Sequence, residues 1–129
     1  MNWSEVLLAL LVSHLVGDFL FQTESQAVGK VGGLRDARSR QALLSHLVYY
    51  MVAFIPALIW IAVEKTAGRA VVVAALIAVP HMLIDDGRMV SFWLRDVKRA
   101  PDASLGLRIA VDQSFHVVCL LAVSLVAAA

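Results

Sequence analysis

Histidine and aspartate recur at one spacing in this sequence, inside stretches that are otherwise apolar. The chain has four histidines. Three of them have an aspartate four residues away, in the pairs His14/Asp18, His81/Asp85 and Asp112/His116. Residues four apart lie on one face of a helix, about a turn from each other. Each pair therefore presents an imidazole nitrogen and a carboxylate to one point, and both are good ligands for Zn, Fe and Mn.

Four long apolar runs hold these pairs. The chain is 60% hydrophobic and 16% charged, whereas soluble domains are about 45–50% apolar and about 25% charged. Crossing a hydrocarbon core of about 30 Å takes roughly 20 helical residues. The sequence therefore predicts an all-α integral membrane protein, a single four-helix transmembrane domain over residues 1–129, with helices at about Trp3–Gln22, Ala42–Val63, Gly68–Asp85 and Leu105–Ala128.

Basic residues concentrate in two of the connections. The first, 23–41, and the third, 86–104, each carry four Lys or Arg residues, and the terminal segments carry none. The positive-inside rule then places both connections in the cytoplasm and both termini in the periplasm, in a bacterial inner membrane. Within the third connection, Ser91–Lys98 is expected to form an interfacial turn with Phe92 and Trp93 toward lipid. Membrane lipid is the expected partner and an oligomer is compatible with the sequence, whereas the net charge of +1 argues against nucleic acid.

The order of residues in the pairs reverses when the helix direction reverses. The first and third runs head toward the cytoplasm and read His-x-x-x-Asp, whereas the fourth heads away and reads Asp-x-x-x-His. In all three, the aspartate is nearer the cytoplasm and the histidine is about 6 Å deeper, from four steps of about 1.5 Å. The remaining histidine lies a few residues into the second run and reaches the same layer. Seven ionisable groups are therefore expected to converge: His14, Asp18, His46, His81, Asp85, Asp112 and His116.

The same pattern contains a weak internal repeat. The first and third runs each carry the His-x-x-x-Asp motif, followed by a basic connection and a helix with an early histidine, His46 or His116. Duplication of a two-helix hairpin would explain this arrangement.

Burying three aspartates in a membrane needs compensation. Each costs about 2.5–3.5 kcal/mol at a helix centre, so the three approach about 10 kcal/mol if unpaired. One or two divalent ions, Zn, Mn or Fe, would offset this cost, since four-helix bundles build two-metal sites from inward side chains. Two other interpretations are a metal-free polar or proton-relay network and a haem held by histidines. Haem would leave the aspartates unexplained.

Five polar residues adjoin these candidate ligands. Hydrogen bonding to the ligands is the expected role of Gln22, Ser45 and Arg108, the last lying four residues before Asp112 as its expected ion-pair partner. The candidate catalytic residues are Asp86 and Gln113. Two other roles for Asp86 are a spare metal ligand and a helix-end charge, and hydrogen bonding to a ligand is the simpler role of Gln113.

The combined motifs resemble a known family. They are His14-Leu-Val-Gly-Asp18-Phe-Leu-Phe-Gln22-Thr23, Ser45-His46, His81-Met-Leu-Ile-Asp85 and Asp112-Gln113-Ser-Phe-His116. Together they resemble the bacterial membrane family of domain of unknown function 3307 over nearly the whole chain, which implies a multi-pass inner-membrane protein. More distantly, the chain is similar to membrane-bound metal-dependent hydrolases of the YdjM type, and this likeness is the main support for hydrolysis. Asp86-Gly87-Arg88 departs from the family, which more often has an aromatic residue and then lysine.

The leading functional hypothesis is a membrane-embedded, metal-dependent hydrolase open to the cytoplasmic leaflet. Its ions would lower the pKa of a bound water and polarise a phosphoryl or acyl group. The basic connections could hold an anionic headgroup, so the expected substrate is a lipid or lipid-linked phosphate. Two alternatives use the same residues: a carrier or channel for metal ions or protons, and a non-catalytic membrane subunit with a structural metal.

Overall fold

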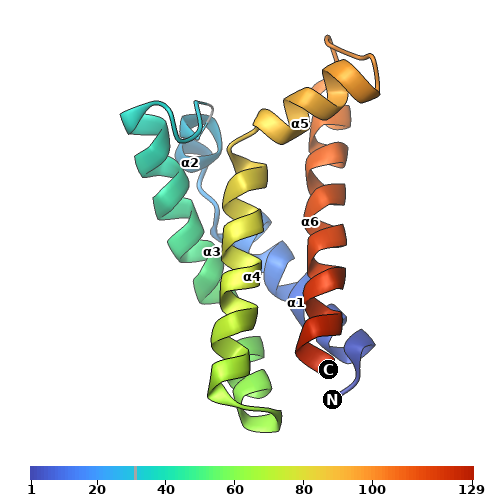
Figure 1. Ribbon diagram of the computed structural model, residues 1–129. Helices are drawn as coiled ribbons and strands as arrows, with labels where there is room; N and C mark the ends of the chain where they lie inside the picture. The colour runs from blue at the N-terminus through green and yellow to red at the C-terminus, as the bar shows by residue number, and fades with distance from the viewer. Residues whose placement is uncertain (31) are drawn as a thin grey trace.

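In the part of the chain that the structure describes, four long helices form a bundle and shorter helices join them (Figure 1). The structure, a computed structural model, describes residues 1–30 and 32–129, and this part contains no strand. The segments long and apolar enough to cross a membrane are Trp3–Phe21, Ala37–Glu64, Ala67–Asp85 and Leu105–Ala128. The first comprises α1 (Trp3–Leu15) and the π-helix η1 (Val16–Phe21), and the others are α3, α4 and α6. The expected all-α, four-helix transmembrane fold is confirmed.

Capping residues set where the long helices begin. Helix α3 begins at Ala37, five residues before the expected start at Ala42, because the Asp36 carboxylate accepts a hydrogen bond from the Ser39 amide at 2.9 Å. The hydroxyl of Thr66 caps α4 in the same way, and that of Ser104 caps α6. Hydropathy finds only the apolar part of a helix, so it missed the polar first turn of α3.

The helices form a closed ring. Helices α1 and α4 each pack against both α3 and α6, which gives the order α1, α3, α4, α6 around the bundle. Both termini lie at the end of the bundle that also holds the short α3–α4 connection, and we call it the terminal end (Figure 1). The opposite end, which carries the two long connections with α2 and α5, is the loop end (Figure 1).

Each long connection contains helix. The first holds α2 (Glu24–Gly29), which the sequence analysis did not predict, and the third holds α5 (Arg88–Phe92) and the π-helix η2 (Trp93–Val97). A capping box begins α2, since Thr23 Oγ1 accepts from the Gln26 amide and Gln26 Oε1 accepts from the Thr23 amide. The expected interfacial turn corresponds to the end of α5 and η2, where Phe92 and Trp93 are exposed.

The interior of the bundle differs between its two halves. Toward the terminal end it is filled by apolar side chains from all four long helices, among them Leu10, Phe54, Ile61, Val73 and Leu120. Toward the loop end it holds the buried histidines and aspartates. The bundle is therefore closed by a packed apolar core toward the terminal end, and its polar site lies toward the loop end.

Candidate metal centre

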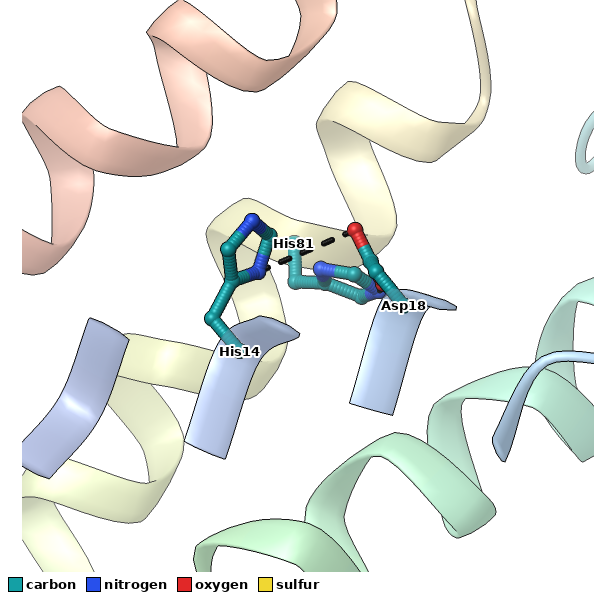
Figure 2. Close-up of side chains that lie close together, drawn as sticks. All are labelled: His14, Asp18 and His81. Carbon is teal, nitrogen blue, oxygen red and sulfur yellow. Dashed lines mark ion pairs between the residues drawn. The ribbon is translucent and has the colours of Figure 1, made fainter. Parts of the chain in front are cut away.

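The seven candidate ligands come together as one cluster. They form three overlapping groups, within each of which the ligand atoms lie within 4.8 Å of one another: His14, Asp18 and His81; His46, His81 and Asp85; and Asp85, Asp112 and His116. Figure 2 shows the first group, in which His14 and Asp18 of the first helix point toward His81 of α4. Adjacent groups share His81 or Asp85, so the cluster is continuous across the bundle.

Four side chains make the most compact part of the cluster, which we call the central set: Asp18, His46, His81 and Asp85. The Nε2 atoms of His46 and His81 are 3.1 Å apart. Asp18 Oδ1 lies 3.3 and 3.7 Å from these two nitrogens, and Asp85 Oδ2 lies 3.3 and 3.4 Å from them. A tetrahedral ion with bonds of about 2.0–2.1 Å holds its ligand atoms about 3.3–3.4 Å apart. The spacing of the central set fits such an ion.

A second set shares Asp85 with the first. Asp85 Oδ1 lies 3.7 Å from His116 Nε2, and Asp112 Oδ2 lies 3.6 Å from His116 Nδ1. The Nδ1–H of His116 donates to the backbone carbonyl of Asp112 at 3.0 Å, which leaves Nε2 of the neutral ring as the acceptor facing Asp85. Ligating histidines are commonly oriented in this way. The two oxygens of Asp85 therefore face different histidines, as a carboxylate shared by two ions would.

Several polar atoms in the cluster are buried without a hydrogen-bond partner among the described residues. They are Asp18 Oδ1, Asp85 Oδ1, His46 Nδ1, His81 Nδ1 and His116 Nε2. Leaving such an atom unpaired costs about 1–3 kcal/mol, and more when the group is charged. A cation between the carboxylates and the imidazoles would satisfy three of these atoms, Asp18 Oδ1, Asp85 Oδ1 and His116 Nε2, so the donor set fits a divalent metal.

Hydrogen bonds distinguish His14 from the other histidines. The amide nitrogen of Gln113 donates to Asp18 Oδ2 and to Asp112 Oδ2, both at 3.2 Å. The amide oxygen of Gln113 therefore accepts, and it lies 2.9 Å from His14 Nε2. Because the proton of the neutral His14 ring is then on Nε2, His14 Nδ1 accepts a hydrogen bond from the Tyr50 hydroxyl at 3.0 Å. A chain of hydrogen bonds thus runs from Tyr50 through His14 and Gln113 to two of the carboxylates.

Tyr50 is a member of the site that the sequence analysis missed. Its side chain is buried, and its ring stacks on that of His81 with centroids 3.5 Å apart. Gly17 faces it from η1, and a Cβ at that glycine would come within 2.6 Å of Tyr50 Cδ2. The signal was present in the sequence, since Tyr50 lies four residues after His46 on the same helix face.

Asp18 lies in the π-helical segment η1. Its i→i+5 hydrogen bonding widens the helix at this point, and π-helical turns occur frequently at functional sites. Asp18 approaches His14 at 3.7 Å through Oδ2, while its Oδ1 reaches the histidines of α3 and α4. The carboxylate therefore links three helices.

A cavity of about 1000 Å³ adjoins the cluster at the loop end. Its lining includes the cluster residues Asp18, Asp85, Asp112 and Gln113. Its basic lining residues are Lys30, Arg35, Arg88, Arg95 and Arg108. Apolar side chains from η1, α5 and α6 complete it, among them Phe19, Phe92 and Ile109. The cavity therefore combines carboxylates, cations and an apolar wall.

Lys30 is the cation nearest the cluster, although the sequence pattern indicates only that it belongs to a basic connection. Its ammonium donates to Asp85 Oδ2 at 2.7 Å. The same oxygen faces His46 and His81. Lys30 therefore joins the first connection directly to the central set.

The three residues expected to hydrogen-bond to the ligands, Gln22, Ser45 and Arg108, make different contacts in the structure. Gln22 lines the cavity. Ser45 Oγ accepts a hydrogen bond from the side-chain amide of Gln26 at 3.2 Å, which joins α2 to α3. The Ser45 hydroxyl donates to the Ala42 carbonyl within α3. The expected ion pair of Arg108 with Asp112 is not among those of the described residues. The guanidinium of Arg108 donates instead to the Pro101 carbonyl at 3.3 Å, near the solvated loop end.

Asp86 holds the two connections together at the end of α4. Its carboxylate accepts from the Leu34 amide at 2.7 Å and pairs with Arg88. Burial opposes its ionisation, but these two donors outweigh burial, so the pKa of Asp86 lies below its ordinary value. The contacts favour a helix-end charge, and a catalytic role for Asp86 stays a prediction.

Comparisons with known proteins place the chain in a family. The family described as Protein of unknown function (DUF3307) matches residues 6–129. No curated protein and no solved structure matches the chain. The more distant likeness to YdjM-type hydrolases is not confirmed by these comparisons. Since the match covers nearly the whole chain, the protein belongs to the DUF3307 family.

Proposed function

We propose that this protein is a metal-dependent hydrolase that acts on a lipid or lipid-linked phosphate at the membrane surface of the loop end. One observation carries the proposal: a buried cluster of histidines and aspartates opens into a cavity lined by both basic and apolar side chains. Metal ligands alone would be compatible with a structural metal site. A cavity beside them that can bind an amphiphilic anion favours an enzyme, because it provides a place for the substrate.

The ligands of the proposed ions follow from the two sets. The first ion would be held by Asp18, His46, His81 and Asp85, and a second by Asp85, Asp112 and His116. The ions would supply a water of lowered pKa and a Lewis acid for the phosphoryl oxygens. We assign His14, with both ring nitrogens in hydrogen bonds, to orient the carboxylates through Gln113. As a ligand, His14 would have to give up one of these bonds.

Asp112 is the carboxylate of the cluster best placed to exchange protons with the cavity. Its side chain is 27% exposed, whereas those of Asp18 and Asp85 are 6% and 1% exposed. Gln113 donates to Asp112 Oδ2 and holds this oxygen in place. We assign Asp112 as the general base that would accept a proton from the attacking water, through the carboxylate oxygen that does not bind the second ion.

The cavity suits a lipid phosphate in size and chemistry. Its volume of about 1000 Å³ lies at the upper end of the roughly 300–1000 Å³ typical of ligand sites. The basic residues would bind the phosphate through charge-assisted hydrogen bonds. Phe19 and Phe92, both exposed on the outside of the bundle, would contact the acyl chain. The loop end would thus face the headgroup region of one leaflet.

Transport through the bundle is less well supported. A channel or carrier would need polar groups along the rest of the path, but the terminal half is filled by buried apolar side chains such as Leu10, Phe54 and Leu120. A buried hydroxyl in this half, that of Ser124, donates to its own helix at the Leu121 carbonyl. These features favour a site that opens on one side only.

Reconstitution in vesicles tests hydrolysis against transport. The purified protein is supplied with phosphatidic acid and Zn²⁺ or Mn²⁺, and both phosphate release and ion movement are followed. We expect chelator-sensitive phosphate release that Asp112→Asn reduces by at least 100-fold and that Asp102→Asn, a change in an exposed residue, leaves unchanged. Ion flux without phosphate release, abolished by Asp112→Asn, would establish transport instead.

A further inference from the structure

The lysine beside the cluster occupies an unusual position for a residue of a basic connection. The Lys30 side chain is 20% exposed, and its ammonium lies 2.7 Å from Asp85 Oδ2, in a carboxylate that is 1% exposed. It also lines the cavity. Lys30 therefore stands between the buried cluster and the space that would receive a substrate.

Three of the other four basic residues of the cavity make their contacts away from the cluster. Arg88 pairs with Asp86, Arg95 pairs with Asp96, and Arg108 donates to a backbone carbonyl in the third connection. Lys30, by contrast, makes its ion pair with the cluster itself. An anion that reaches the cluster through the cavity therefore meets Lys30 at the same point.

Segment α2 holds Lys30 in this position. The side-chain amide of Gln26 donates to Ser45 Oγ on α3. The backbone amide of Gln26 donates to Thr23 Oγ1, and Gln26 Oε1 accepts from the Thr23 backbone amide, which completes the capping box. The Lys30 amide continues the helix by donating to the Gln26 carbonyl at 3.1 Å. The backbone of Lys30 is thus fixed to the bundle, and its ammonium lies against Asp85 at the border of the cavity.

Charge balance indicates what kind of anion would bind. Three ionised aspartates contribute three negative charges, while two divalent ions would contribute four positive charges and Lys30 a fifth. The loaded site would hold an excess of two positive charges in a largely buried environment, where an unbalanced charge is costly. A phosphate monoester, with a second pKa near 6, carries close to two negative charges at pH 7. A phosphate diester carries one.

We propose that Lys30 and the metal-loaded cluster form a binding site that prefers dianionic phosphate monoesters to phosphate diesters. The inference rests on the proposed function and narrows its substrate class. Lys30 exchanges its bond to Asp85 for a charge-assisted bond to the phosphate, for which a lysine ammonium is a common partner. A terminal phosphate on a lipid and free inorganic phosphate offer the same chemistry.

Binding measurements on the full chain test this proposal without an activity assay. Protein in detergent is loaded with Zn²⁺ or Mn²⁺, its metal content is measured, and it is titrated calorimetrically with three probes. These are inorganic phosphate, dioctanoyl phosphatidic acid as a monoester, and dioctanoyl phosphatidylglycerol as a diester. We expect the monoester lipid to bind at least 10-fold more tightly than the diester lipid. Binding of inorganic phosphate as well would show that the headgroup suffices, whereas binding of phosphatidic acid alone would assign the site to lipid.

Variants of Lys30 identify its part in binding. Lys30→Met should keep the metal content and weaken binding of both monoester probes by at least 10-fold, and Lys30→Arg should retain most of the binding. Lys98→Met, at an exposed position of the same end, serves as the matched control. Unchanged monoester binding in Lys30→Met, or equal binding of the two lipids by the wild type, would overturn the inference and leave the proposed function standing. Failure of the wild type to take up metal would overturn both.

Discussion

The Nε2 atoms of His46 and His81 face each other at 3.1 Å, one from α3 and the other from α4. A hydrogen bond between them needs a proton on one ring only. Carboxylate oxygens of Asp18 and Asp85 lie within 3.7 Å of both nitrogens. A divalent ion would draw all four atoms toward one centre, which makes this pair the most direct place to test for metal.

Loss of a ligand from the central set should lower metal content. We expect detergent-purified protein to hold about one or two Zn, Mn or Fe ions per chain, because the cluster contains two ligand sets that share a carboxylate. His81→Gln or Asp85→Asn should remove at least one of them, as measured by elemental analysis after gel filtration. Asp102→Asn is the control. Wild-type protein without metal, and without affinity for it after reconstitution, would contradict the prediction and favour a proton-relay network.

Tyr50 should increase metal affinity without being a ligand. Its hydroxyl donates to His14 Nδ1, so Tyr50→Phe removes the first bond of the chain that ends at Asp18 and Asp112. Loss of a hydrogen bond made directly to a metal ligand typically weakens metal binding about 10- to 100-fold. We expect the lower end of this range, about 10-fold, because Tyr50 reaches the carboxylates only through His14 and Gln113. Competition with a chromogenic chelator measures this affinity. Tyr49→Phe, at the exposed neighbour, should change nothing, and a lowered stoichiometry in Tyr50→Phe would argue against a purely supporting role.

Gly17 should be intolerant of a side chain. An added Cβ would lie 2.6 Å from Tyr50 Cδ2 and 3.2 Å from Tyr50 Cα, so either η1 or α3 must move. We expect Gly17→Ala to reduce the free energy of unfolding by about 1–3 kcal/mol, the usual cost of overpacking. Titration of the detergent-solubilised protein with sodium dodecyl sulfate measures the change. Gly106→Ala is the matched control, because a Cβ there meets no atom within 4 Å, and equal stability of the two variants would contradict the prediction.

The sequence predicted the parts of the fold and site that depend on local pattern. Apolar runs located four helices, and spacing of four residues located His14, Asp18, His81 and Asp85 on shared faces. Contacts that depend on tertiary packing could not be found this way. Lys30 reaches the cluster because α2 folds back onto α3, 55 residues from its partner in sequence. For Arg108, local spacing predicted a contact that the described part of the structure does not contain: it lies four residues before Asp112, but its guanidinium donates to the Pro101 carbonyl.

Asp86 should stabilise the junction of the two connections only when ionised. Because its pKa is below the ordinary value of 3.8, its contribution is present above that pH and is lost as pH falls through the lower folded-state pKa. Asp86→Asn should therefore lower the free energy of unfolding by about 1–3 kcal/mol at pH 7, through loss of charged hydrogen bonds to Leu34 and Arg88. The difference from wild type should shrink toward zero in acid. A destabilisation that is the same at pH 3 and pH 7 would show that charge is not the cause.

Both ends of the chain should lie on the side of the membrane opposite the site. The basic residues belong to the first and third connections, which occupy the loop end, while both termini lie at the terminal end (Figure 1). By the positive-inside rule we expect the loop end to face the cytoplasm. A C-terminal alkaline phosphatase fusion should therefore be active and a C-terminal green fluorescent protein fusion dark, while the same reporters inserted at Asp102 should give the reverse pattern. An inactive phosphatase with a fluorescent C-terminal fusion would place the cavity on the periplasmic side, and a lipid substrate would then have to come from the outer leaflet.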